Sequence, residues 1–317
     1  MNSCLLHNKT TQKLTLRDRV INTLKTDNTI PSFSAAAQRL IRTLNRQDTD
    51  IGSVAEIVEL DPGLTAQFLK LASSPAFGVQ EIRNIREAVM VVGLNEARKI
   101  ATTLLVMDNL RQFRVKVNWD LFWLHCLLTA RMTEHLADAY REVDGREYLA
   151  GLLHDVGKLF LEHYFIQEFE LIILRASLTR LGMYEAEMQL LDLSHAEVSS
   201  LLCEKWKLNP EVIRSIRWHH DPFSEKNTDP ANKDDPTFLA NCICLADKVA
   251  NLCHANIQGT ENLDEVVLES LPEWTRLKQR TPRKTLIMDM ASELQISEDI
   301  INATKVAAKP GRAAPVS

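Results

Sequence analysis

Residues 148–161 read YLAGLLHDVGKLFL, an apolar segment interrupted by His154, Asp155 and Lys158. Its apolar pattern predicts a helix from Tyr148 to Phe165. An imidazole or a carboxylate buried without a partner is costly, so His154 and Asp155 need partners from elsewhere in the chain. A histidine–aspartate pair alone is more often structural than functional, and its meaning depends on the residues that accompany it.

Further histidines and one aspartate stand in similar apolar surroundings in the second half of the chain. They lie on, or at the ends of, apolar helical stretches: His125, His195, His219, His220 and Asp247. A divalent cation shared among these side chains would neutralise the aspartates and use the lone pairs of the imidazoles. The alternative is a set of polar groups that hydrogen-bond one another.

The rest of the chain also predicts helices. Only 10 glycines and 11 prolines in 317 residues favour long helices over many short strands. Helix start signals recur along the chain, at Ser53 with Glu56, Asp61-Pro62, Asn84 with Glu87, Asp120, Ser194 with Glu197, and Asn209-Pro210. We therefore expect an all-α fold.

The helical pattern breaks between Phe113 and Asn118, which indicates a junction between two parts. We expect an N-terminal helical lobe packed on a helical bundle, followed by a helical extension. The predicted divisions are a flexible N-terminus (1–16), the lobe (17–118), the bundle (119–255), the extension (256–305) and a disordered tail (306–317).

Composition and charge narrow the class of protein. Hydrophobic residues make up 45% and charged residues 25%, which is ordinary for a globular protein. A net charge of −5 with a pI near 6.0 gives no electrostatic case for nucleic-acid or membrane partners. No segment approaches the ~18 apolar residues of a membrane span. The six cysteines lack zinc-ribbon or CxxC spacing, so we expect buried reduced thiols and a cytoplasmic protein.

Two resemblances follow from these motifs. The order His125, His154-Asp155, Asp247, with Lys158 completing an HDxGK string, resembles the HD superfamily of metal-dependent phosphohydrolases. The first half, with AEIVELDPGLTAQFLKLASSPAFG (55–78) and IREAVMVVGLNEARKIA (85–101), resembles the HDOD family of bacterial signalling proteins. The HDOD-like domain is expected over residues 17–255, with an HD-like bundle as its second part.

The resemblance implies a metal site with one or two divalent ions, such as Fe, Mn, Ni, Zn or Mg. His125, His154, Asp155 and Asp247 would hold the first ion, with Asp155 bridging to the second. His195, His219 and His220 would hold that second ion, as in the HD-GYP branch. If the site is catalytic, Asp155 and Lys158 would take part, with Lys158 facing a phosphate oxygen.

Two departures limit the resemblance. Asp221-Pro222-Phe223 follows the paired histidines, with no GYP string before Asp247, and Leu121 stands where an additional acidic ligand would precede His125. Hydrolysis of cyclic di-GMP is therefore not expected.

The expected function is that of a bacterial signal-transduction or regulatory protein. It would act through contacts with other signalling proteins, or by sensing a phosphorylated small molecule or a metal. One alternative is a metal-dependent phosphohydrolase acting on a nucleotide or phosphodiester. Another is a purely structural scaffold with an empty site.

Overall fold

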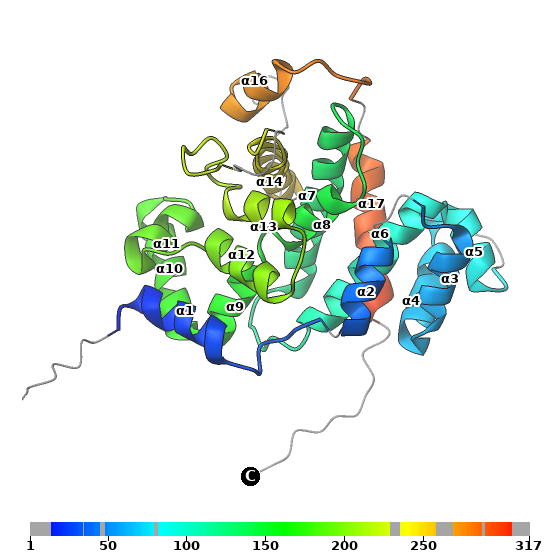
Figure 1. Ribbon diagram of the computed structural model, residues 1–317, viewed down its shortest axis with the longest axis horizontal. Coiled ribbons are helices and arrows are strands. Elements are labelled where there is room, and N and C mark those ends of the chain that lie inside the picture. Colours follow the sequence, from blue (N-terminus) through cyan, green and yellow to red (C-terminus); the bar gives the residue numbers. More distant parts are fainter. Residues whose placement is uncertain are drawn as a thin grey trace, which may run out of the picture.

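The computed structural model describes residues 14–33, 35–44, 48–78, 82–228, 235–257, 269–286 and 289–305. Every regular element in these ranges is a helix, which confirms the expected all-α fold (Figure 1). In the same ranges, no helix combines the length and apolarity needed to cross a membrane.

The two predicted ends of the chain lie largely outside the described residues. Of the predicted flexible start, residues 1–13 are not described, and α1 already begins at Leu16 with Thr15 as its N-cap. The predicted disordered tail, residues 306–317, is outside the described part altogether.

The first part of the chain forms a group of short helices on one side of the molecule (Figure 1). It comprises α2 (Ala35–Leu44), α3 (Ile51–Glu59), α4 (Pro62–Ala72), the 3-10 helix η1 (Pro75–Phe77), α5 (Ile85–Val92) and α6 (Leu94–Leu110). The helix before this group, α1 (Leu16–Thr26), instead reaches the second part of the chain, where Arg17 pairs with Glu197 at 2.7 Å.

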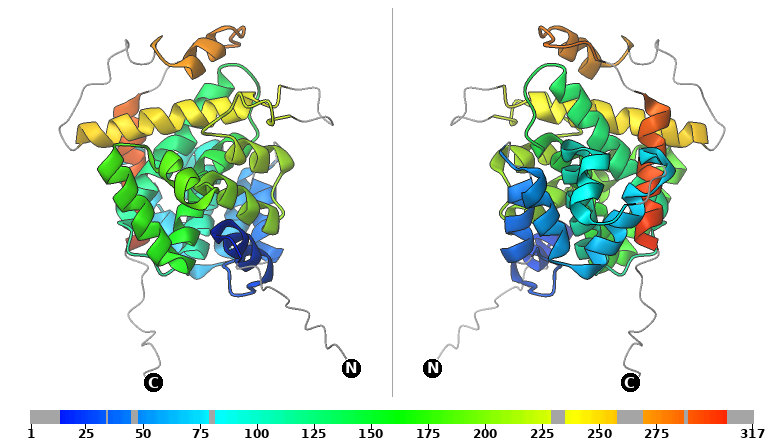
Figure 2. Two further views of the ribbon diagram at one scale, coloured as in Figure 1. Left: turned by 90° about the vertical axis from the view of Figure 1, so that its left-hand side faces the viewer. Right: turned by 90° about the vertical axis from the view of Figure 1, so that its right-hand side faces the viewer.

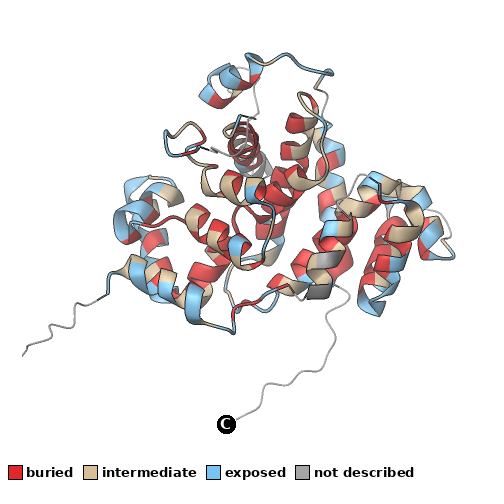
Figure 3. Cartoon of the chain, in the orientation of Figure 1, coloured by how far each residue is buried: buried red, intermediate tan, exposed pale blue. Residues whose placement is uncertain are grey.

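The second part is a bundle around a central helix, α7 (Trp119–Asp138). It also comprises α8 (Arg146–Leu153), α9 (Val156–Tyr164), α10 (Ile166–Thr179), α11 (Met183–Leu191), α12 (His195–Lys205), α13 (Pro210–Arg217) and α14 (Phe238–Ile257), of which α8 and α14 pack directly against α7. One hydrophobic core runs from the first group of helices into this bundle, and Figure 3 shows buried residues in the helices of both parts.

Two helices follow the bundle, α16 (Pro272–Lys278) and α17 (Met290–Lys305). α16 covers a smaller apolar cluster between α7 and α14. α17 returns across the molecule and lies against α7 and α4 (Figure 2). Arg131 of α7 fixes this return, because its buried guanidinium pairs with Glu96 of α6 and with Glu293 of α17. The C-terminal helix is therefore tied to both parts of the chain.

Most predicted helix starts are confirmed by side-chain caps. Asp61, Asn84, Ser194 and Asn209 each accept a hydrogen bond from a backbone N–H of the helix that follows.

Two predicted starts are wrong by a few residues. The helix assigned to Ser53 begins earlier, because the carboxylate of Asp50 accepts from the N–H of Ser53 at 2.7 Å and acts as the N-cap. Asn118 rather than Asp120 caps α7, because its Oδ1 accepts from the N–H groups of Asp120 and Leu121. In both places an earlier capping side chain takes the first free N–H groups of the helix.

The predicted helix from Tyr148 to Phe165 is in fact two helices. α8 ends at Leu153, and Asp155 leaves the helical conformation with φ −106° and ψ 3° before α9 begins. The N–H of Gly157 bonds to the hydroxyl of Ser199 on α12 at 2.7 Å instead of to a helical carbonyl. The break thus comes from a tertiary hydrogen bond.

Gly157 also sets how closely α9 approaches α12. A Cβ at this position would lie 2.2 Å from the carbonyl oxygen of His195 and 2.8 Å from the backbone nitrogen of Ser199. Gly151 plays the same part between α8 and α7, where a Cβ would lie 2.6 Å from the Cα of Ala130. The nearest atoms at both positions belong to the backbone and cannot move aside, so a side chain would have to push the helices apart.

We therefore expect Gly157→Ala to lower the free energy of unfolding by about 3 kcal/mol, because the helices cannot separate without opening the core. Urea unfolding followed by circular dichroism measures this. The control is Gly52→Ala in α3, where a Cβ would meet the flexible end of Arg86 at 3.3 Å and Oδ1 of Asp50 at an ordinary contact distance of 3.5 Å. The control should stay within about 1 kcal/mol of the unmodified protein. Equal losses in both variants would contradict the packing argument.

Candidate metal centre

The structure brings the predicted ligand side chains together in the middle of the bundle. They come from separate elements: His125 from α7, His154 and Asp155 from the break between α8 and α9, His195 from the first position of α12, His219 and His220 from the turn after α13, and Asp247 from α14. All are buried except His220, which is partly exposed. Residues up to 122 positions apart in sequence (125 to 247) thus share one small volume.

The first cluster gathers around Nε2 of His125. This atom lies 3.2 Å from Nε2 of His154, 3.4 Å from Oδ2 of Asp155 and 3.1 Å from Oδ1 of Asp247. Nε2 of His154 is likewise 3.4 Å from Oδ2 of Asp155 and 3.7 Å from Oδ1 of Asp247. Imidazole nitrogens and carboxylate oxygens thus point at one another in a tight group.

A second cluster adjoins the first. The ligand atoms of His195, His219 and His220 lie within 4.8 Å of one another, as do those of His125, His154 and Asp155. Nε2 of His195 is 2.9 Å from Nε2 of His220 and 3.1 Å from Oδ1 of Asp155. One carboxylate therefore turns Oδ2 to the first cluster and Oδ1 to the second.

The hydrogen bonds behind the imidazoles leave their inner nitrogens available as ligands. Nδ1 of His154 lies 2.7 Å from the carbonyl oxygen of Gly151, and Nδ1 of His219 lies 2.7 Å from that of Ile216. Each Nδ1 therefore carries the proton, and Nε2 presents its lone pair to the centre. Among the described residues, the buried Nε2 of His219 has no hydrogen-bond partner. These features fit a divalent metal site.

A further functional residue, Glu187 of α11, escaped the sequence analysis. It is fully buried, and its Oε2 accepts from both the backbone N–H and Nδ1 of His195, at 2.7 and 2.6 Å. A carboxylate behind a histidine ligand fixes the ring and makes it a stronger donor to a metal. The only sequence signal was an acidic residue eight positions before His195, which is too common to single out.

The histidines differ strongly in their affinity for protons. Burial would lower the pKa of His125, but the neighbouring Asp155 and Asp247 outweigh it and raise the pKa to about 9. Burial would also lower the pKa of His195, but Glu187 and Asp155 outweigh it and raise the pKa to about 9. His219, by contrast, is held neutral, because burial and the nearby histidines lower its pKa to about 3.

The aspartates remain charged in spite of their burial. Desolvation alone would raise the pKa of Asp155, but His154, Lys158 and His195 hold it well below its usual value. The neighbouring His125 and His154 likewise hold the pKa of Asp247 well below its usual value against desolvation. The two negative charges would therefore neutralise a divalent cation bound beside them.

Lys158 lies one helical turn after Asp155 and pairs with it. Its Nζ is 2.5 Å from Oδ2 of Asp155, and the side chain is 26% exposed. Burial would lower the pKa of Lys158, but Asp155 and Asp247 outweigh it and raise the pKa to about 12. A cation therefore stands beside the carboxylate that both clusters share.

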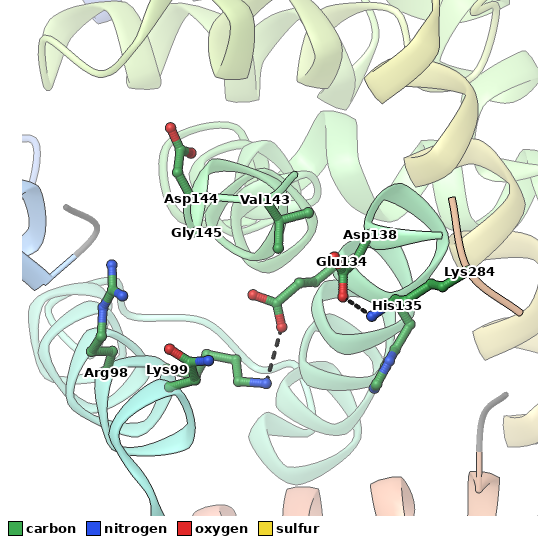
Figure 4. A pocket seen from close by; sticks show the side chains of 10 residues that line it. Arg98, Lys99, Glu134, His135, Asp138, Val143, Asp144, Gly145 and Lys284 are labelled. Carbon is green, nitrogen blue, oxygen red and sulfur yellow. Dashed lines mark hydrogen bonds and ion pairs between the residues drawn. The ribbon is translucent and has the colours of Figure 1, made fainter. Parts of the chain in front are cut away.

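Two cavities lie away from these side chains. One cavity of about 230 Å³ lies between α6, α7 and the loop at Val143–Gly145, and its charges are largely paired, as Lys99 with Glu134 and Lys284 with Asp138 (Figure 4). A second, of about 300 Å³, is lined by residues of α2, α8 and the turn before α13.

Comparison with known proteins gives a consistent result. The HDOD domain family matches residues 30–222, more than half of the chain. A crystal structure of an HDOD domain protein of unknown function from Geobacter sulfurreducens is 25% identical, with a TM-score of 0.67, and the match covers 92% of this chain and 96% of that one.

Two further crystal structures share the fold at 20% identity. One, from Shewanella amazonensis SB2B, is described as a candidate phosphohydrolase (TM-score 0.64, 91% of this chain and 98% of that one). The other, from Marinobacter aquaeolei VT8, is described as a candidate signal transduction protein (TM-score 0.63, 94% of this chain and 62% of that one).

A curated relative, an uncharacterized protein of Treponema pallidum (strain Nichols), is 25% identical over 199 residues. The match covers 61% of this chain and only 38% of that relative.

Protein purified without chelators is expected to hold roughly one to two equivalents of a divalent transition metal. Asp155→Asn removes the charge that both clusters share, so metal content or affinity should fall at least about tenfold. Elemental analysis and titration with Mn²⁺ measure this. His163→Ala is the control, because that imidazole contacts the backbone of Arg114 outside the centre. Unchanged metal content in Asp155→Asn would exclude Asp155 as a ligand.

Metal affinity is expected to rise with pH between about 6 and 9, since an ion must displace the protons that His125 and His195 hold up to a pKa of about 9. Each displaced proton adds up to about one logarithmic unit of affinity per pH unit below that pKa. Calorimetric titration with Mn²⁺ in two buffers of different ionisation enthalpy measures the protons released. An affinity that is flat over this range would contradict the protonation states described above.

Proposed function

The chain belongs to the HDOD family, and on that premise we propose that it is a regulatory protein of bacterial signal transduction with a divalent metal in its buried His/Asp centre. It acts through contacts with other signalling proteins, and the centre serves as a receptor for the metal or for a phosphorylated small molecule that the metal helps to bind. Nucleic acid and membrane have no part in this proposal.

The observation that carries the proposal is the position of Asp155 between two histidine clusters. Its Oδ2 is 3.4 Å from Nε2 of both His125 and His154, while its Oδ1 is 3.1 Å from Nε2 of His195. Only a carboxylate can offer separate oxygens to two neighbouring ions. His125, His154, Asp155 and Asp247 would hold one ion, and His195, His219 and His220 the other.

Lys158 supports a phosphorylated ligand. It is the charged side chain nearest the shared carboxylate and is partly exposed, so its ammonium can meet a phosphate that approaches the centre. His220, also partly exposed, lies on the same cluster as His195. These two residues mark where a ligand can reach an otherwise buried site.

A receptor fits the burial of the centre better than an enzyme does. His154 and His219 are fully buried, and Asp155 is 2% exposed. A hydrolase must admit both a substrate and water to its reacting atoms, whereas a metal receptor needs to admit only the ion.

The second candidate is a metal-dependent phosphohydrolase acting on a nucleotide or phosphodiester. The pairing of two clusters through one carboxylate supports it, because a divalent ion bound there would polarise a phosphate oxygen and lower the pKa of a water molecule. Lys158 would orient the phosphate, and Asp155 would hold the metal side of the site.

A cytoplasmic location is part of the proposal. Cys126, Cys203, Cys242 and Cys244 are buried free thiols. Burial raises the pKa of the Cys203 thiol above its usual value, so this thiol stays protonated and unreactive. Such cysteines are typical of proteins from reducing compartments.

The two candidates are separated by assaying the metal-loaded protein against nucleotides, cyclic dinucleotides and phosphomonoesters, with Asp155→Asn in parallel. We expect saturable binding of at least one phosphorylated compound without turnover, and loss of that binding in Asp155→Asn. Hydrolysis of any compound that Asp155→Asn abolishes would establish the enzyme instead.

A companion measurement in the native host tests the regulatory role. Replacing the chromosomal gene by Asp155→Asn should reproduce part of the gene-expression change seen on deletion, whereas His163→Ala should not. If Asp155→Asn left expression unchanged while deletion altered it, the centre would have no part in signalling.

A further inference from the structure

An unusual amount of apolar surface lies on one side of the bundle. Of the eleven large apolar side chains that are strongly exposed in the described residues, seven lie on α10 and α11, which is too many for chance scatter. They are Ile166, Leu171, Ile173, Leu174, Leu178, Met188 and Leu190. The left view of Figure 2 looks onto this side, and much of it is exposed in Figure 3.

The apolar residues of α10 form two opposite faces. Phe169 and Ile172 point into the core and are buried. Leu171, Leu174 and Leu178 lie on nearly the opposite side and are 55%, 52% and 75% exposed. A surface helix ordinarily carries polar residues there. We call this outer row of three leucines the leucine stripe. It places apolar side chains where a surface helix is expected to have polar ones.

The spacing within the leucine stripe is that of a coiled-coil seam. Leu171 and Leu174 are three positions apart, and Leu174 and Leu178 are four apart, which is the alternation that keeps a seam facing a partner helix. Glu170 and Arg175 flank the stripe on its two sides. In a parallel pair of helices, a flanking residue faces the one five positions later on the other helix.

Glu170 would then face Arg175 of the partner subunit, and symmetry repeats the pair. Neither charge is strongly engaged within its own chain. Glu170 pairs with Lys116 at 3.1 Å, but both side chains are more than half exposed, so that pair contributes little. Within the described residues, Arg175 donates to the neutral amide of Gln189, at 3.1 and 3.3 Å.

We propose that this protein forms a symmetric homodimer in which α10 packs in parallel against α10 of a second copy through the leucine stripe. Glu170 and Arg175 carry opposite charges on the two sides of the stripe, so each would pair with its opposite on a second copy. This favours a second copy over an unrelated helix as the partner. Met188 and Leu190 on the adjacent α11 extend the apolar surface beyond a single helix. The dimer does not depend on the metal centre.

The first test compares two leucines that are both more than half exposed. Leu174→Lys places a charge in the stripe, and Leu60→Lys places one after α3, where Leu60 is 71% exposed. Sedimentation velocity of the full chain from about 1 to 100 µM covers the range of a specific dimer. We expect a dimer for the unmodified protein and Leu60→Lys, and a monomer for Leu174→Lys with an unchanged helical circular dichroism spectrum.

The second test exchanges the flanking charges and leaves the apolar surface intact. Glu170→Arg and Arg175→Glu should each weaken the dimer about tenfold, since each creates two like-charge contacts, and the double exchange should restore it. A monomeric unmodified protein over the whole range, or a dimer that survives Leu174→Lys, would overturn the proposal. Weakening by Arg175→Glu without any effect of Glu170→Arg would exclude the parallel arrangement.

Discussion

Asp155 carries a negative charge although it is only 2% exposed, and the packing of the surrounding bundle must compensate this charge. A carboxylate removed from water needs compensation from close by, and here it comes from His154, Lys158 and His195. His154 and Lys158 flank the break between α8 and α9, whereas His195 comes from α12, so these elements must be held in place by their own contacts. The break between α8 and α9 is one such device, because it turns neighbouring residues toward the same centre.

The groups that compensate the charge of Asp155 are themselves held by further polar contacts. Glu187 accepts two hydrogen bonds from His195, so a second buried carboxylate supports the ring that neutralises the first. α11 therefore fixes the orientation of the ring that joins the second cluster to Asp155. The same short hairpin, α10 and α11, carries the outward apolar surface of the molecule. The centre and this surface are thus built on connected elements.

The sequence revealed the parts of the site that are chemically out of place. His154 and Asp155 interrupt an apolar segment and could be recognised locally, as could the caps Asp61 and Ser194, whose hydrogen bonds reach only three residues along the chain. Glu187 could not be recognised, because a glutamate in an amphipathic helix looks the same whether it faces water or a histidine. Its role depends on where α11 packs, which no local pattern records.

A long-range contact also explains why the predicted helix from Tyr148 to Phe165 is broken. The helix break after Leu153 follows from the bond between Gly157 and Ser199, 42 residues apart. Gly157 also offers a criterion for judging other members of the family. A relative that keeps every histidine and aspartate but carries a side chain at this position could not hold α9 and α12 so close. Such a protein would have the ligand residues in its sequence, but they would not come together to form this centre.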